Sequence, residues 1–305
     1  MTNSKVSLIT TVKNAGPHIG EWLDSVSAQT HRPDEVIVVD GGSTDGTLAT
    51  LRAAEGITLI EEPGANIARG RNIAIAAASH DVVALTDADC ILEPAWLARL
   101  VERIDGGADV AMGFYRPIAE SFWQTCSAAV SLPEPDEIRE ETFMPSGRSM
   151  AFRAEAIEAA GGFPEWLDIG EDMYVDLQWR RLGMRMDLAA DAVSYWRVRQ
   201  SVAATWRQYY KYARGDAIAG MHPRRHLVRL GVYTGALTVV RSNRRLPRYA
   251  AAVAAVAYAS RPIRRAWAML ETPEEKAAAA VVVPALMAFS DAAKIAGYAA
   301  GLFDR

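Results

Sequence analysis

Short apolar runs alternate with segments of helical spacing through the first half of the chain. The runs are rich in Val, Ile and Leu, as expected for strands buried on both faces of a sheet. We expect strands at residues 6–12, 35–40, 57–60, 82–85 and 110–112, separated by helices at 19–29, 43–54 and 67–78 and by one that Pro94 opens. This alternation predicts an α/β fold, with a mostly parallel sheet that carries helices on both faces.

The pattern changes after residue 112. Residues 113–150 are loop-like, with Pro, Glu and Asp concentrated near their middle and room for one acidic helix. A loop this long in a compact domain is usually a lid or a binding loop. A strand at 149–153, a helix from Ala154 and helices at 171–182 and 203–219 are expected to follow.

Three apolar stretches lie beyond His222, at residues 227–240, 249–260 and 277–303. A membrane-spanning helix needs about 20 consecutive apolar residues. The first two stretches are shorter than that, and Pro284, Asp291 and Lys294 interrupt the third. We therefore expect helices that lie in a membrane interface, with a soluble helical cap as the alternative. The predicted domains are residues 1–220 and an Ala-rich, basic helical tail at 221–305.

The distribution of charge supports this division. The chain has 305 residues, half of them apolar, and a net charge of −4. Residues 222–305 carry 13 Lys and Arg against 5 Asp and Glu, a net +8, which leaves −12 for residues 1–221. A basic tail predicts an anionic partner surface, and a membrane is favoured over nucleic acid because the tail has no interleaved aromatic pattern or nucleic-acid motif.

The two cysteines, Cys90 and Cys126, form neither a zinc spacing nor a disulfide framework, which fits a reducing cytosol. The first residues lead into a strand without the apolar core of a signal peptide. We expect the protein at the cytoplasmic face of the cell membrane, attached as a peripheral or monotopic protein.

Polar residues cluster where the predicted strands end. The segment from Thr11 to Asn14, the carboxylate of Asp40 and the tripeptide Asp87-Ala88-Asp89 each follow an apolar run. In parallel sheets, ligands bind outside the carboxyl ends of the strands. Two carboxylates held one residue apart suit Mg²⁺ or Mn²⁺, which proteins usually hold together with substrate phosphates. This edge of the sheet is the candidate site for a divalent cation and a diphosphate.

On the basis of these and further motifs, the chain resembles the family 2 glycosyltransferases, the GT-A class of inverting sugar-nucleotide transferases. The resemblance covers residues 5 to about 215 and rests on four motifs in order. The motifs are Thr10-Thr11-Val12-Lys13-Asn14; the run from Asp40 to Thr47; Gly70-Arg71-Asn72 ahead of Asp87-Ala88-Asp89; and Gly161-Gly162-Phe163 with Gly170-Glu171-Asp172, Arg180 and Gly183.

The resemblance implies roles for individual residues. Asp40 would accept a hydrogen bond from the imino group of uracil, and Asp87 would face the ribose or a metal-bound water. Asp89 would ligate the cation that spans the diphosphate. The donor nucleotide, UDP by preference, would be bound by Thr11, Lys13, Asn14, Asp40, Arg71, Asp87 and Ala88.

Asp172 would be the general base that takes the proton from the acceptor hydroxyl, with Glu171 as the alternative base or as a residue that holds the acceptor. A general base must come within hydrogen-bond distance of that hydroxyl. Both carboxylates also suit a helix N-terminus for purely electrostatic reasons, so the sequence leaves this structural reading open.

The chain departs from the family pattern in two places. The family often has a His beyond the base, whereas residues 193–197 contain none and the nearby ones are His222 and His226; Arg148 stands where many relatives carry Asn. Arg197 or Arg199 would then neutralise the diphosphate. The acceptor or diphosphate candidates are Arg148, Trp196, Arg197 and Arg199.

The Gln-x-x-Arg-Trp signature of processive synthases is also absent, because residues 178–181 have another order. We therefore expect one sugar to be transferred per encounter, to a hydroxyl of a lipid, a lipid-linked glycan or another envelope acceptor. Two alternatives stay open at this point: a sugar-1-phosphate nucleotidyltransferase, and a membrane-bound scaffold that keeps the fold without the chemistry.

Overall fold

The computed structural model describes residues 4–242 and 244–305 and divides the chain into two compact units. The first unit runs to Ile118 and resumes over Pro135–Arg197. The second consists of Ala119–Glu134 and Val198–Arg305. The division at residue 220 expected from the sequence stays a prediction.

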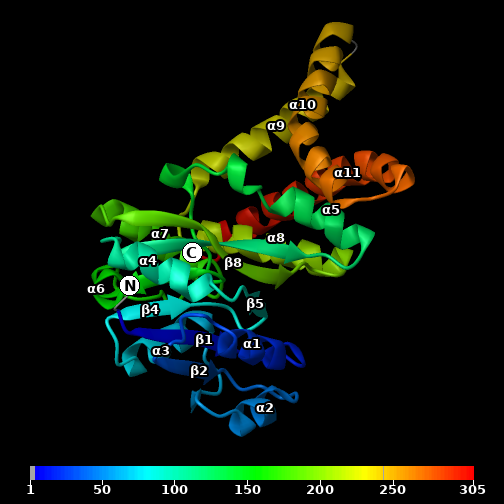
Figure 1. The fold of residues 1–305 in the computed structure, drawn as a ribbon. Coiled ribbons are helices and arrows are strands. Elements are labelled where there is room, and N and C mark those ends of the chain that lie inside the picture. The colour runs from blue at the N-terminus through cyan, green and yellow to red at the C-terminus, as the bar shows by residue number, and fades with distance from the viewer. Residues whose placement is uncertain (1–3, 243) are drawn as a thin grey trace. The chain divides into compact units, whose positions relative to one another are not determined.

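One mixed sheet organises the first unit (Figure 1). Within the described residues it has eight strands in the order β3-β2-β1-β4-β7-β6-β8-β5. The first four in this order are parallel, whereas β7 runs antiparallel to both its neighbours and β5 runs antiparallel to β8. The strands are β1 (Val6–Val12), β2 (Glu35–Asp40), β3 (Thr58–Glu61), β4 (Val82–Leu85), β5 (Cys90–Leu92), β6 (Val110–Ile118), β7 (Met150–Arg153) and β8 (Met186–Arg197). The α/β class predicted from the sequence is confirmed.

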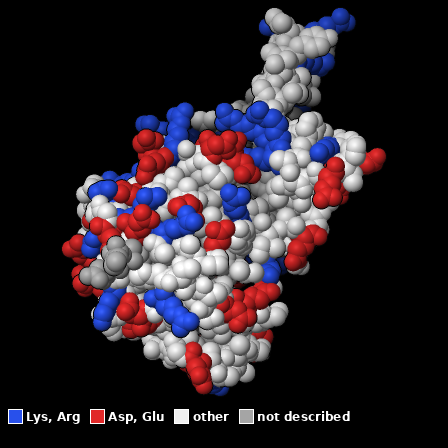
Figure 2. Space-filling view, viewed as in Figure 1, with Lys and Arg blue, Asp and Glu red and all other residues white. Residues whose placement is uncertain are grey.

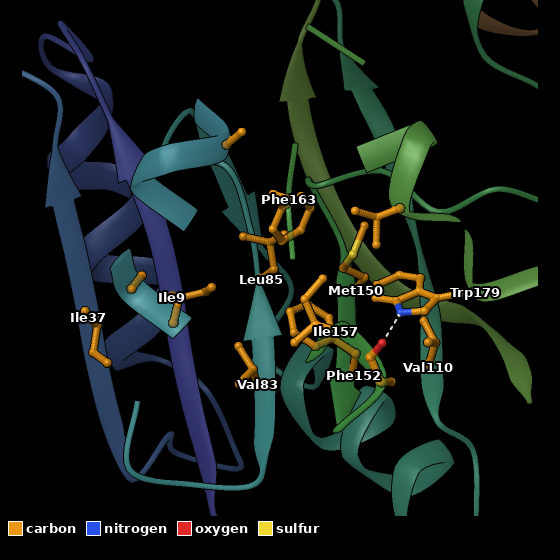
Figure 3. Close-up of a cluster of buried hydrophobic side chains, with 14 of the residues drawn as sticks. Ile9, Ile37, Val83, Leu85, Val110, Met150, Phe152, Ile157, Phe163 and Trp179 are labelled. Carbon is orange, nitrogen blue, oxygen red and sulfur yellow. Dashed lines mark hydrogen bonds between the residues drawn. The ribbon is translucent and has the colours of Figure 1, made fainter. Parts of the chain in front are cut away.

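Helices of the first unit pack on this sheet through an apolar core. They are α1 (His18–Ser27), α2 (Thr47–Ala53), α3 (Ile67–Ala77), α4 (Trp96–Asp105), α6 (Ala154–Ala159) and α7 (Glu171–Leu182). Figure 3 shows Phe152 of β7 beside Trp179 of α7, and Ile9 and Leu85 on β1 and β4, all of them buried. The Trp179 indole N–H donates to the carbonyl of Ala156 at 2.8 Å, so its polar atom is satisfied inside the core.

The register of the strands brings the candidate site together. Val12 lies opposite Asp40 and Ile9 lies opposite Leu85, so the carboxyl ends of β1, β2 and β4 share one edge. Because β7 is antiparallel to β4, Leu85 pairs with Met150 at the start of β7. The residues just before β7 therefore reach the same edge.

The expectation of one long loop at residues 113–150 is wrong. Residues 113–118 continue β6, which pairs with β8 through a register shift after Gly113. Helix α5 (Phe122–Ser131) then belongs to the second unit, and only short 3₁₀ turns, Pro135–Glu137 and Glu140–Thr142, lie in the acidic part. Gly113 and Pro117 hide the alternation of β6 in the sequence, because neither is a favourable strand residue.

The second unit is helical. It contains α5, α8 (Val202–Ile218), α9 (Pro223–Arg241), α10 (Arg245–Met269) and α11 (Pro273–Phe303). Its core joins α5, α10 and α11 through small and aliphatic side chains such as Cys126, Ala266 and Leu286. By length and composition α11 is long and apolar enough to cross a membrane, a test that the core helix of a soluble protein also passes.

Two glycines let α11 lie directly against α8. A Cβ added to Gly297 would come 2.0 Å from the carbonyl oxygen of Tyr210, and one added to Gly301 would come 2.5 Å from that of Arg214. Both distances are shorter than any real contact, so a side chain at either position would force the helices apart. This packing identifies α11 as a helix of the unit's core.

We expect Gly297→Ala to destabilise the protein, because the added methyl group meets backbone that cannot rotate away. Gly235→Ala is the matched control, since Gly235 is also helical and a Cβ there would meet nothing within 4 Å. Exchanging an exposed helical Gly for Ala stabilises by roughly 0.5–1 kcal/mol. Thermal unfolding should therefore show a lower transition temperature for Gly297→Ala only. Equal transition temperatures would contradict the α8–α11 contact.

Candidate active site

The Asp40 carboxylate stabilises the turn after β2 with one oxygen and leaves the other without a hydrogen-bond partner among the described residues. Its Oδ1 accepts hydrogen bonds from the backbone N–H groups of Gly42 and Ser43, both at 2.8 Å. Its Oδ2 is buried and has no hydrogen-bond partner among the described residues. Leaving a buried carboxylate oxygen unpaired is costly, so this atom is suited to accept from a ligand N–H.

Asn14 fastens the end of β1 to the same turn. Its backbone has a φ of 56°, in the left-handed region that Asn tolerates. Its Oδ1 accepts from the Thr44 N–H at 2.8 Å, and its own N–H donates to the Ser43 hydroxyl at 2.9 Å. Ser43 and Thr44 therefore lie in the turn before α2, which begins at Thr47 and not at residue 43 as expected from the sequence. Lys13, beside Asn14, is exposed.

Arg71 joins two motifs that lie 100 residues apart. From α3 its Nη1 donates to Glu171 Oε1 at 2.7 Å, and its Nη2 donates to Asp87 Oδ1 at 3.0 Å. Only 3% of the Arg71 side chain is exposed, so water contributes little to its solvation. The two carboxylates are therefore its charge partners inside the protein.

The surroundings of Arg71 are shaped to hold it. A Cβ added to Gly147 would lie 2.1 Å from Arg71 Nη2, so only glycine leaves room for the guanidinium there. Phe163 offers its ring 5.1 Å from the guanidinium carbon. Asn72 fixes the turn that carries Phe163: it donates to the Phe163 carbonyl at 2.9 Å and accepts from the Phe163 N–H at 2.8 Å. In the structure Asn72 therefore secures this turn.

Glu171 and Asp172 begin α7 in different environments. Gly170 precedes them with a φ of 86°, a conformation that turns the chain sharply into the helix. Glu171 is 4% exposed, and burial raises the pKa of its carboxyl to about 7 against the opposing charge of Arg71. Asp172 is half-buried, and its Oδ2 accepts from the Gly147 N–H at 3.1 Å. Of the two, Asp172 is the carboxylate that does not bind Arg71.

Asp176 is a buried carboxyl that we did not select from the sequence. It lies one turn of α7 after Asp172, is fully buried, and has no hydrogen-bond partner for either oxygen among the described residues. Burial, followed by the charge of Asp172, raises the pKa of Asp176 well above its ordinary value. In the sequence, the feature that could have identified Asp176 is its position on the apolar side of α7, between Val175 and Trp179.

Arg148 lies between two aromatic rings beside Asp87. Its guanidinium carbon is 4.4 Å from the Trp196 ring and 5.0 Å from the Tyr115 ring. Its Nε is 3.9 Å from Asp87 Oδ2, and its Nη1 donates to the Ser146 hydroxyl at 2.9 Å. Two rings and a carboxylate hold a positive charge at the edge of the sheet where the strand ends meet.

The other candidate arginines are placed differently. Arg197 pairs with Glu21 of α1, with Nη2 at 2.8 Å from Oε2. Arg199 belongs to the second unit. His226, one of the two histidines noted from the sequence, also lies there and binds Asp216 at 2.8 Å. Arg180 donates to the carbonyls of Glu141 and Phe143, and so holds the acidic segment against α7.

Asp87 and Asp89 fit a divalent cation only together with a substrate. Among the described residues no group of three or more His, Cys, Asp and Glu side chains could hold an ion. Mg²⁺ is usually bound by one or two carboxylates plus substrate phosphates. A diphosphate next to Asp89 and Asp87 would complete such a set, so the donor chemistry suits a cation that arrives with the nucleotide.

Comparisons with known proteins agree with this geometry. The profile of Glycosyl transferase family 2 matches residues 7–158, and that of Glycosyl transferase family 21 matches residues 141–305. The glycosyltransferase AglE of Haloferax volcanii is 28% identical over 199 residues, 62% of this chain and 65% of that one. The O-antigen chain rhamnosyltransferase RfbN of Salmonella typhimurium is 27% identical over 204 residues, with the same two shares.

The matches therefore span slightly less than two thirds of these relatives' length. A solved structure, the mannosyltransferase PcManGT of Pyrobaculum calidifontis in complex with GDP-Man and Mn²⁺, has the same fold with a TM-score of 0.57 and 22% identity. That comparison covers 99% of this chain and 88% of the neighbour. The resemblance and the fold class drawn from the sequence are both confirmed: the chain is a glycosyltransferase of the family 2 type with a GT-A fold.

Proposed function

We propose that the protein transfers one sugar, with inversion, from a nucleoside-diphosphate sugar to a hydroxyl of a lipid, lipid-linked or other envelope acceptor. The observation that carries this proposal is the Arg71 bridge. One buried guanidinium binds Asp87 on the expected donor side and Glu171 on the expected acceptor side. An inverting displacement needs those two sides held in a fixed relation, because the nucleophile must approach opposite the leaving group.

The donor nucleotide is assigned from Asp40. Its unpaired, buried Oδ2 can accept from a ring N–H. Uracil presents such a group, whereas adenine and cytosine do not, so UDP is the nucleotide we propose. Guanine also presents one, and PcManGT was solved with GDP-Man, which makes GDP the nucleotide against which UDP has to be compared.

The diphosphate would face Arg148 and the two carboxylates of the tripeptide. A divalent cation held by Asp89 and Asp87 would neutralise charge on the leaving diphosphate. Arg148 supplies a second, fixed positive charge at that place, because Trp196 and Tyr115 restrict its movement. Arg197 is paired with Glu21, so we now assign the role of compensating charge to Arg148.

Asp172 is the base we propose. Glu171 is engaged by Arg71 and buried, which leaves it poorly placed to receive a proton from an acceptor. Asp172 is oriented by the Gly147 N–H and keeps partial exposure. Glu171 then acts as a positioning residue that fixes the first turn of α7.

We place the reaction at the cytoplasmic face of a membrane. The net charge of +8 over residues 222–305 favours an anionic lipid surface. An acceptor carried by a lipid explains why a transferase would be held there.

Asp172→Asn should bind nucleotide as the wild type does and transfer sugar at least about a hundredfold more slowly, the usual scale for loss of a general base. The measurement is release of UDP from a panel of UDP-sugars with a lipid-linked acceptor. Glu171→Gln is the companion variant. If Asp172→Asn kept wild-type turnover while Glu171→Gln lost it, the assignment of the two carboxylates would be reversed.

We expect the protein to retain part of its nucleotide affinity when the divalent cation is removed. Calorimetry with UDP should show weaker but measurable binding in EDTA, because Arg148 and Arg71 remain. Asp89→Ala should abolish the gain that Mn²⁺ provides, whereas Arg148→Gln should reduce the affinity in EDTA by at least about tenfold.

Arg197→Gln is the control for Arg148→Gln, since Arg197 is paired with Glu21. It should bind UDP in EDTA as the wild type does. Complete loss of wild-type binding on chelation would contradict the role of Arg148. Exchange of pyrophosphate into a nucleotide-sugar would instead mark a nucleotidyltransferase.

A further inference from the structure

Large apolar side chains stand exposed on both helices of the α9–α10 hairpin, which we define as Pro223–Arg241 and Arg245–Met269. In α9 the only buried residue is His226, and in α10 the buried residues are Ala259, Pro262 and Ala266. Exposed patches of this size mark interaction sites. The exposed side chains are Leu227, Val228, Leu230, Val232, Leu237 and Val240 on α9, and Leu246, Tyr249, Val253, Val256, Tyr258, Trp267 and Met269 on α10.

The exposed apolar side chains of α9 are distributed around the whole circumference of this helix. Successive residues of a helix are about 100° apart, so Leu227, Val228 and Val232 cover one half of the circumference and Leu230, Leu237 and Val240 the other. A helix that lies in a membrane interface needs a polar face. A helix that is apolar all round is buried in a core or in a membrane. The flat arrangement suggested by the sequence therefore does not suit this hairpin.

Arginines bound the apolar part at both ends. At the tip are Arg241, Arg244, Arg245 and Arg248, and at the base are Arg224, Arg225, Arg229, Arg261, Arg264 and Arg265. Figure 2 shows the Lys and Arg colour at the far end of the hairpin and a mostly white surface along its length. Between Arg229 and Arg241, or between Arg248 and Arg261, a rise of 1.5 Å per residue gives a band of about 18–20 Å.

That band is shorter than a bilayer core of about 30 Å. The arginines at its two ends can extend the span, because their long side chains reach toward the headgroups. Arg side chains extend along a helix to reach headgroups while their stems stay in hydrocarbon, and a bilayer thins around a short span. A hairpin that stopped halfway would leave the tip arginines at the bilayer centre, where each charge is costly. A full crossing is therefore favoured over partial entry.

The Thr and Ser hydroxyl groups within the band already have hydrogen-bond partners. The hydroxyl groups of Thr234 and Thr238 donate to the carbonyls of Leu230 and Thr234 one turn earlier, both at 2.9 Å. The Ser260 hydroxyl donates to the Ala257 carbonyl at 2.7 Å. Hydrocarbon offers no replacement partner, so hydroxyls bonded to their own helix suit a lipid environment.

The base of the hairpin is fastened to α8 and α11 by charged groups. His226 donates to Asp216 at 2.8 Å through Nε2, because Arg229 donates to its Nδ1 at 3.0 Å. Arg229 also binds Asp291 at 2.8 Å, and the Tyr233 hydroxyl donates to the other oxygen of Asp291 at 3.0 Å. These contacts end at Tyr233, about one turn into the band that begins at Arg229.

We propose that the α9–α10 hairpin spans an anionic phospholipid bilayer, whereas α11 stays in the core of the helical unit. The six base arginines outnumber the four at the tip, which places the base on the cytoplasmic side. This deepens the membrane location proposed above and depends on neither the sugar nor the acceptor.

Two exposed valines, one on α10 and one on α11, allow membrane insertion of the hairpin to be tested separately from that of α11. Val253 on α10 is 69% exposed and Val281 on α11 is 72% exposed, so Val253→Asp and Val281→Asp introduce the same charge at equally exposed positions. We expect the wild type and Val281→Asp to float with vesicles of phosphatidylcholine and phosphatidylglycerol. Val253→Asp should lose at least about tenfold of its vesicle affinity.

The depth of the hairpin in the bilayer is measured separately with a fluorophore attached to a single cysteine. Cys90 and Cys126 are buried, so a cysteine placed at Val253 or Val281 can be labelled selectively. A nitroxide at carbon 12 of the lipid chain should quench a probe at Val253→Cys strongly and one at Val281→Cys weakly. An impermeant maleimide should reach Ser242→Cys from the side of the bilayer opposite the base.

The proposal is overturned if Val253→Asp floats like the wild type, or if Val281→Asp is the variant that detaches. It is also overturned if the protein forms a stable dimer without lipid that Val253→Asp dissociates, because the band would then bind a second copy. UDP binding by the variants is measured in parallel. Loss of UDP binding in every form, with normal flotation, would reject the proposed transferase chemistry and leave the hairpin in place.

Discussion

One buried ion pair network, centred on Arg71, holds the candidate active site together. A guanidinium withdrawn from water is tolerable only with opposite charges in good geometry, and Asp87 and Glu171 provide them. Removing one partner would leave the guanidinium with a single compensating carboxylate, and removing both would leave its charge uncompensated. The lack of a side chain at Gly147 and the turn that Asn72 secures both serve to accommodate this one group.

The network also separates the roles of neighbouring carboxyls. Glu171 binds Arg71, and burial raises its pKa to about 7. Asp172, the next residue, is turned toward the Gly147 N–H instead. Asp176 is buried one turn further on, and burial raises its pKa well above the ordinary value. Three carboxyls on the first turns of one helix therefore lie in three different environments.

The parallel strands could be predicted because Val and Ile runs buried on both faces leave a plain pattern, and their carboxyl ends located Asp40, Asp87 and Asp89. The partners of these residues could not be predicted, since Arg71–Glu171 and Arg148–Trp196 are contacts between distant segments. Arg197 has the same chemistry as Arg148, and only the fold shows that it faces Glu21. The hairpin's apolar stretches were evident, but whether they packed on other helices was a tertiary property.

A double-mutant cycle joining Asp87→Asn and Glu171→Gln tests most directly whether one guanidinium couples the two sides of the site. At pH 8, above the pKa of Glu171, the free energies of unfolding should deviate from additivity by at least about 1 kcal/mol, because both carboxylates compensate the same charge. At pH 5 Glu171 is protonated, so the deviation should shrink, and in an Arg71→Met background it should vanish. Additive effects within about 0.5 kcal/mol at pH 8 would contradict the coupling.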